Sequence, residues 1–130
     1  KFLRTRVRNL RKNLEESGIN YDQIFRSIQN LASSRDTLNF YFDKFYNEIV
    51  DKKKNKCSIN VKALNKLNYE MKFKIFKKSI KEFSNSYYAP RSKKIFNLIN
   101  QFEYSKYVKL TLGGCIFTKE KNFIVMRKEN

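Results

Sequence analysis

Arginines near the start of the chain are the residues whose type and spacing point most directly to chemistry. Four of them fall close together: Arg4, Arg6, Arg8 and Arg11. The planar guanidinium pairs bidentately with phosphate, and crowded guanidinium groups repel one another unless an anion lies nearby. We therefore interpret this segment as facing phosphates. The alternative is a basic helix face that is merely solvated.

A second basic group follows Pro90, a residue suited to the first turn of a helix. It consists of Arg91, Lys93 and Lys94. Positive charge at the start of a helix opposes the helix dipole. We therefore expect an anion to lie near this point.

The composition limits the function classes that remain. The chain has 130 residues, of which 41% are hydrophobic, enough for a folded core. Its 29 basic and 12 acidic residues give a net charge of +17, which favours nucleic acid over a membrane as partner. A lysine-rich composition explains part of this excess without any function, but it does not explain the clustered arginines.

Several chemistries lack the residues they need. The chain has no histidine, the commonest general base and zinc ligand, and we expect no metal site. Cys57 and Cys115 are too far apart in sequence for a paired metal motif and too few for a disulfide framework, so a reduced, cytoplasmic setting is expected. No glycine-rich phosphate loop and no apolar run of membrane-spanning length occurs.

The first half of the chain has helical periodicity. One apolar stripe, beginning at Leu3 and ending at Leu14, predicts a helix that stops before Ser17-Gly18. Asn20 is the expected N-cap of a longer helix, and the two helices are expected to pack antiparallel as a helical hairpin. The near-heptad apolar seam of the longer helix comprises Ile24, Ile28, Leu31, Arg35, Leu38, Phe42, Phe45 and Ile49. Arg35 interrupts this seam, and we expect it to reach the rim or to pair with a carboxylate such as Asp36 or Glu48.

The second half predicts helices and strands. The polar, basic stretch 51–56 predicts a linker, and 57–61 a short strand. Helices are expected over 71–83 and after Pro90, the first carrying five exposed lysines as a further basic patch: Lys72, Lys74, Lys77, Lys78 and Lys81. Alternating apolar residues over 108–112, the pair Gly113-Gly114, a polar turn over 120–122 and an apolar return over 123–127 predict a small antiparallel sheet.

The predicted fold class is therefore α+β and mostly helical: a helical hairpin followed by a small domain of helices packed on a short antiparallel sheet. The predicted division is 1–50, a linker over 51–56, and 57–130. Cys115 is expected to be a small buried side chain.

Three motifs occur in the order seen in one enzyme family. Arg4-Thr-Arg-Val-Arg8 is similar to the R-x-R-[IV]-R helix of tRNA(Ile)-lysidine synthetases, and Tyr88-Ala-Pro-Arg91 is similar to their Y-P-P-R element, with alanine in place of the first proline. Thr111-Leu-Gly-Gly-Cys115, followed by a short hairpin and Arg127-Lys-Glu129, resembles the end of their first C-terminal domain. Leu31-Ala-Ser-Ser-Arg35 resembles the alphaproteobacterial branch, whereas 52–84 agrees only in hydrophobic pattern.

The resemblance implies a ligase acting on the isoleucine tRNA with a CAU anticodon. Such enzymes use ATP to adenylate the wobble cytidine at C2, and lysine then displaces AMP to give lysidine. In this family an N-terminal PP-loop domain bearing S-G-G-x-D-S binds ATP with Mg, and this chain lacks that motif. We therefore expect a C-terminal fragment that is inactive alone, in which 1–50 complete the catalytic domain and 57–130 bind tRNA.

The same resemblance assigns roles to the basic residues. Arg4, Arg6, Arg8 and Arg11 are expected to contact phosphates near the active-site cleft, and Arg91, Lys93, Lys94 and Arg127 to hold the tRNA farther away. No catalytic residue is expected in this chain, and a homodimer is possible. Two alternatives stay open: an autonomous basic RNA-binding module, and an adaptor whose long helix pairs with a partner helix.

Overall fold

The computed structural model describes residues 2–129, so Lys1 and Asn130, at the ends of the predicted domains, lie outside the described part. The chain divides into two compact units, an N-terminal unit up to Tyr41 and a C-terminal unit from Phe42. The division falls within a helix and not in the polar stretch 51–56.

The N-terminal unit consists of α1 (Phe2–Glu16) and most of α2 (Tyr21–Ile49). Both predicted ends are present: Gly18 takes a left-handed φ of 84° after α1, and Asn20 Oδ1 accepts a hydrogen bond of 2.9 Å from the Gln23 amide at the start of α2. No residue of α1 is buried. The apolar stripe of α1 therefore remains open to solvent. It is not buried against α2, as the predicted antiparallel hairpin would require.

The last turns of α2 belong to the core of the C-terminal unit. Phe42, Tyr46 and Ile49 are buried there, whereas Phe45, expected in the seam, is 38% exposed. Around a helix with 3.6 residues per turn, positions 45 and 46 flank Phe42 and Ile49 on opposite sides, and the C-terminal unit covers the side of Tyr46. Arg35, farther up α2, pairs with Asp36 at 3.5 Å, one of its two expected partners.

A five-stranded antiparallel sheet organises the C-terminal unit, in the order β1-β2-β5-β4-β3. Its strands are β1 (Val50–Lys52), β2 (Cys57–Asn60), β3 (Lys109–Leu112), β4 (Cys115–Glu120) and β5 (Phe123–Lys128). The three-stranded meander predicted from the sequence is present and consists of β3, β4 and β5. The predicted linker over 51–56 is instead part of a β-hairpin, because residues 50–52 pair with β2 and the Lys53 amide donates to the Lys56 carbonyl at 2.8 Å.

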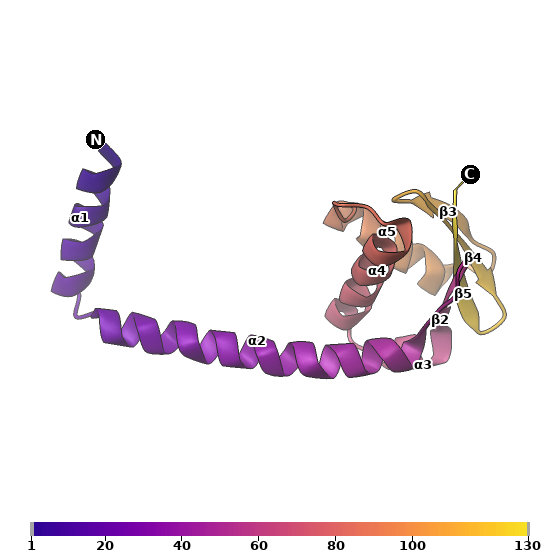
Figure 1. Cartoon of the computed structure of the whole chain (residues 1–130), viewed down its shortest axis with the longest axis horizontal. Coiled ribbons are helices and arrows are strands. Elements are labelled where there is room, and N and C mark those ends of the chain that lie inside the picture. The colour runs from indigo at the N-terminus through magenta and orange to yellow at the C-terminus, as the bar shows by residue number, and fades with distance from the viewer. Residues whose placement is uncertain (1, 130) are drawn as a thin grey trace. The chain divides into compact units, whose positions relative to one another are not determined.

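Three helices complete this unit: α3 (Val61–Asn65), α4 (Tyr69–Ser84) and α5 (Ser92–Tyr104). Asn60 and Asn68 cap the first two, because their side-chain oxygens accept hydrogen bonds from the Ala63 and Met71 amides. Helices α4 and α5 lie on the same side of the sheet (Figure 1), and Phe76, Ile95 and Phe117 are among the fully buried core residues. The fold is thus α+β and mostly helical, as predicted, with apolar burial as its main stabilising contribution.

The turn between β3 and β4 is packed unusually close to the helices. Gly113 and Gly114 both have left-handed φ values, 61° and 75°. A Cβ atom at Gly113 would lie 2.7 Å from Ile80 Cγ2 and 3.0 Å from Pro90 Cγ, whereas one at Gly114 would meet nothing within 4 Å. Gly113 therefore combines the two reasons for a glycine, a left-handed conformation and a close approach.

Candidate nucleic-acid interface

Helix α1 presents its arginines to solvent. Arg4, Arg6 and Arg8 are exposed, and no carboxylate among residues 2–129 lies within ion-pair distance of them. Arg11 differs, because its Nε donates to Glu15 at 3.0 Å and its guanidinium lies 5.0 Å from the centre of the Tyr21 ring. The hydrogen bond to Glu15 and the nearby Tyr21 raise the pKa of Arg11 above its ordinary value.

The helical geometry sorts these arginines by direction. At about 100° per residue, Arg4, Arg8 and Arg11 project from one side of α1 and Arg6 from the opposite side. One extended anion can therefore contact the first three together. Arg6 is available only to a ligand, or a second part of one, that reaches the other side.

The second basic group lies at the start of α5. Arg91 is the N-cap residue and makes no side-chain capping bond, and Lys93 and Lys94 follow in the first turn. All three are exposed, and none has an ion-pair partner within the described part of the chain. The three basic residues that are close in sequence are therefore also close in the structure, at the start of α5.

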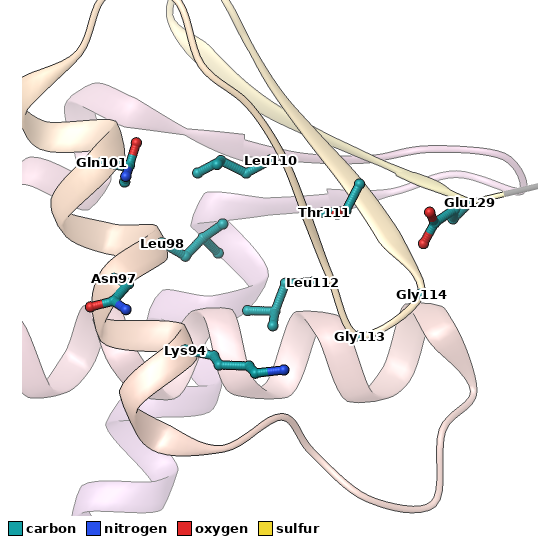
Figure 2. A pocket seen from close by; sticks show the side chains of 10 residues that line it. All are labelled: Lys94, Asn97, Leu98, Gln101, Leu110, Thr111, Leu112, Gly113, Gly114 and Glu129. Atoms are coloured by element: carbon teal, nitrogen blue, oxygen red, sulfur yellow. The ribbon is translucent and has the colours of Figure 1, made fainter.

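A groove runs between α5 and the edge strand β3 beside this group, with a volume of about 360 Å³. Its lining includes Leu98 and Leu112, which point toward one another from α5 and β3 (Figure 2). Lys94 extends from α5 toward the Gly113 turn. Polar groups of Asn97, Gln101, Thr111 and Glu129 also line it. The groove thus offers an apolar floor with an ammonium group at one end.

A second hollow of about 440 Å³ adjoins the groove. Arg91 and Tyr88 line it, and it shares Lys94, Leu112 and Gly113 with the groove. Because the Tyr88-Ala-Pro-Arg91 loop packs on Gly113, the two sequence motifs form one continuous surface.

Arg127 stands apart from the other proposed binding residues. It lies on β5 and donates from Nη1 to Glu120 at 2.9 Å and to Thr118 at 3.3 Å. The hydrogen bond from Arg127 is the main cause of a pKa for Glu120 below its ordinary value. A phosphate can reach this guanidinium fully only by competing with that ion pair.

Only part of the exposed basic patch predicted on α4 is present: Lys77 and Lys81 are exposed, whereas Lys72, Lys74 and Lys78 are half-buried and have carboxylate partners. Lys72 is only 12% exposed and contacts Glu103 at 2.6 Å, Lys74 lies 3.7 Å from Glu70, and Lys78 contacts Asp43 at 2.9 Å. Lys77 lies over the Phe73 ring. Two of these partners come from other elements, Glu103 on α5 and Asp43 on α2, so the spacing within one segment does not reveal them. Glu70 lies on α4 itself, four residues before Lys74.

Four exposed tyrosines lie around α5, and of these the sequence motifs include only Tyr88. Tyr87 and Tyr88 precede it, and Tyr104 and Tyr107 lie at its other end, with exposed fractions of 83, 78, 86 and 95%. The available signal was their position among serine, asparagine and lysine residues, outside any apolar period.

Comparison of the chain with known protein families gives no match, and comparison with curated proteins gives no similar sequence. None of the helices described between residues 2 and 129 is long and apolar enough to cross a membrane.

Proposed function

We propose that this chain is the tRNA-binding C-terminal portion of a tRNA(Ile)-lysidine synthetase. The observation that carries the proposal is the set of guanidinium groups on α1 that have no carboxylate partner in residues 2–129: Arg4, Arg6 and Arg8. Unpaired, exposed arginines in a chain of charge +17 are what a polyphosphate ligand requires. Their spacing matches the R-x-R-[IV]-R motif of tRNA(Ile)-lysidine synthetases.

The fold gives a physical reason for two of the family-like motifs to occur together. The Gly-Gly turn and the Tyr88-Ala-Pro-Arg91 loop are in direct contact through Gly113 and Pro90. A protein that uses Arg91 and Lys94 to bind tRNA needs this contact to hold the start of α5 in place. The contact supports the proposal, because one structural unit accounts for two separate stretches of sequence.

The proposal divides the work between this chain and a catalytic domain. ATP with Mg and the substrate lysine bind to a PP-loop domain, which residues 1–50 help to complete. Residues 57–130 grip the tRNA bearing the CAU anticodon through Arg91, Lys93, Lys94 and Arg127. This chain alone forms no lysidine, and a homodimer of the whole enzyme is compatible with the arrangement.

The direct test is binding of the chain to isoleucine tRNA with a CAU anticodon, compared with an equal-length tRNA for another amino acid. Tighter binding of the isoleucine tRNA is expected. Equal affinities would favour an autonomous RNA-binding module. Reading the coding sequence ahead of Lys1 gives an independent check. An in-frame S-G-G-x-D-S, followed just before Lys1 by D-x-S-N, the catalytic-domain segment that precedes the arginine-rich helix in this family, supports the synthetase. A start codon at that point refutes it.

A second candidate function has one observation in its favour. Apolar side chains on the N-terminal part of α2 are open to solvent, among them Ile28 at 58%, Leu31 at 71% and Leu38 at 60%. Their heptad spacing fits a helical partner, as an adaptor would require. Oligomerisation that rises with concentration and is insensitive to salt, without RNA affinity, would favour the adaptor over tRNA binding.

A further inference from the structure

Tyr87 and Tyr88 are highly exposed, although burial of their large apolar rings would be favourable. The two residues are 83 and 78% exposed, whereas Tyr46 in the same unit is 2% exposed. The two rings are arranged edge to face, with centres 4.7 Å apart and planes at 83°. Because they are not stacked on one another, a ring face remains open to a planar ligand.

Tyr88 stands beside unpaired cations, and Tyr87 is in contact with Tyr88. Tyr88 shares its hollow with Arg91 and Lys94, and that hollow continues into the groove between α5 and β3 through Lys94, Leu112 and Gly113. Among the residues lining the two hollows, Glu129 is the only carboxylate. The surface therefore combines open aromatic faces, positive charge and a groove with an apolar floor.

That combination fits a nucleic-acid strand whose bases are unpaired. A base in a duplex has both faces covered by its neighbours, so it cannot stack on a tyrosine. An unpaired base can, and its phosphates then lie within reach of arginine and lysine side chains. An extended peptide could also occupy the groove, but the excess of cations around it favours a polyanion.

We propose that the Tyr88 loop and the α5–β3 groove form a binding site for single-stranded RNA, with unpaired bases stacked on Tyr87 and Tyr88 and phosphates held by Arg91 and Lys94. This inference rests on the proposed RNA-binding function and deepens it, because it specifies unpaired nucleotides as the ligand of this surface.

The test uses two probes of equal nucleotide number, a labelled single-stranded oligouridylate and an RNA duplex. Replacing both rings, Y87L/Y88L, is expected to weaken single-strand binding roughly thirtyfold, since each of the two lost base–ring stacks accounts for at least about fivefold in affinity. Duplex binding is expected to change less than twofold. Y87F/Y88F keeps the rings and is expected to retain wild-type affinity for both probes.

Two controls separate stacking from charge and from general surface change. Y41L replaces another exposed tyrosine, on α2, and is expected to leave both affinities unchanged. R91A/K94A removes charge and is expected to weaken both probes. Circular dichroism verifies that each variant is folded.

The outcomes distinguish the two levels of the proposal. If Y87L/Y88L leaves single-strand affinity unchanged, or weakens both probes equally, while R91A/K94A weakens both, the stacking site is overturned and RNA binding stands. If the wild-type chain binds neither these probes nor tRNA, both the stacking site and the proposed function fail.

Discussion

Gly113 packs so closely against Pro90 that a Cβ atom added to the glycine would lie 3.0 Å from Pro90 Cγ. The same added atom would lie 2.7 Å from Ile80 Cγ2 in the core. The β3–β4 turn is therefore seated directly on α4 and on the loop before α5. This contact positions the basic start of α5 relative to the edge of the sheet.

Replacing Gly113 with alanine is expected to destabilise the C-terminal unit more than the same change one residue later. Both glycines have a left-handed φ, which costs an alanine about 1–2 kcal/mol. Only G113A adds a steric clash, and overpacking costs roughly a further 1–3 kcal/mol. The free energy of unfolding, measured by urea denaturation, compares G113A with G114A. Equal losses for the two variants would show that Gly113 does not require close packing.

The proposed tRNA binding is expected to become less dependent on salt when the unpaired arginines of α1 are removed. Affinity falls as salt rises, and each lost phosphate contact reduces the magnitude of the slope of log affinity against log salt by about 0.7–0.9. R4A/R6A/R8A therefore should lower the slope by roughly two to three units. Binding is measured by filter retention or anisotropy over a range of salt concentrations.

A matched triple variant controls for the loss of three charges. Lys12, Arg35 and Lys53 each already face a carboxylate, at 3.7, 3.5 and 3.8 Å. K12A/R35A/K53A is expected to change the slope by less than one unit, since these cations have local partners. If both triple variants lower the slope equally, the α1 arginines contribute only net charge.

Local patterns predicted most of the fold. The caps at Asn20 and the glycine stop after α1 follow from short-range hydrogen bonding and backbone freedom, so they are readable in sequence. The alternation over 108–112 likewise marks β3 and the meander that follows it. The buried Cys115 agrees with its expected role as a small apolar side chain.

Features that depend on distant partners were not predictable. Strand β1 contains Asp51 and Lys52, and its pattern has no apolar alternation; it forms because Val50 is buried and residues 50–52 pair with β2. Lys121 takes the left-handed φ of the last hairpin, although the next residue, Asn122, is of the type that tolerates this conformation better. In the candidate interface, the pairing of Arg127 with Glu120 and of Lys72 with Glu103 depends on side chains brought together only by the tertiary fold.

Glu82 is expected to make stability depend on pH in the acid range. Its carboxylate accepts hydrogen bonds from Lys52 and from the Tyr46 hydroxyl, the latter at 3.2 Å, and Lys78 lies nearby. Partial burial opposes ionisation, but the bonds from Lys52 and Tyr46 and the charges of Lys52 and Lys78 outweigh it, so the pKa of Glu82 lies below its ordinary value. A carboxyl group with a lowered pKa in the folded state stabilises it above the ordinary pKa, and this stabilisation is lost as the pH falls through the folded-state pKa.

The measurement is the free energy of unfolding of wild type and E82Q between pH 7 and pH 3. At pH 7 the variant is expected to be less stable by about 1 kcal/mol, because the ion pair is partly exposed. The difference should shrink as the pH falls below the ordinary value for a glutamate. A difference that stays constant down to pH 3 would exclude Glu82 as the titrating group. Y46F, which removes one neutral donor, is expected to lower stability while the acid transition remains.

The two cysteines are expected to be unreactive while the chain is folded. Cys57 and Cys115 are fully buried free thiols, on β2 and β4. Burial raises the pKa of Cys57 to about 11 and also raises the pKa of Cys115. Since the thiolate is the reactive form, modification by a disulfide reagent at pH 8 should proceed no faster than unfolding exposes the thiols. S86C, which adds a thiol on the exposed loop before α5, is the positive control and should react at once. Rapid modification of a wild-type thiol under conditions where circular dichroism shows a folded chain would contradict the packing of β2 and β4 against the helices.

The raised pKa of Cys57 also makes the free energy of unfolding depend on pH in the alkaline range. The stabilisation associated with the buried thiol is fully present below the ordinary thiol pKa and declines as the pH rises toward 11, because the unfolded chain ionises first.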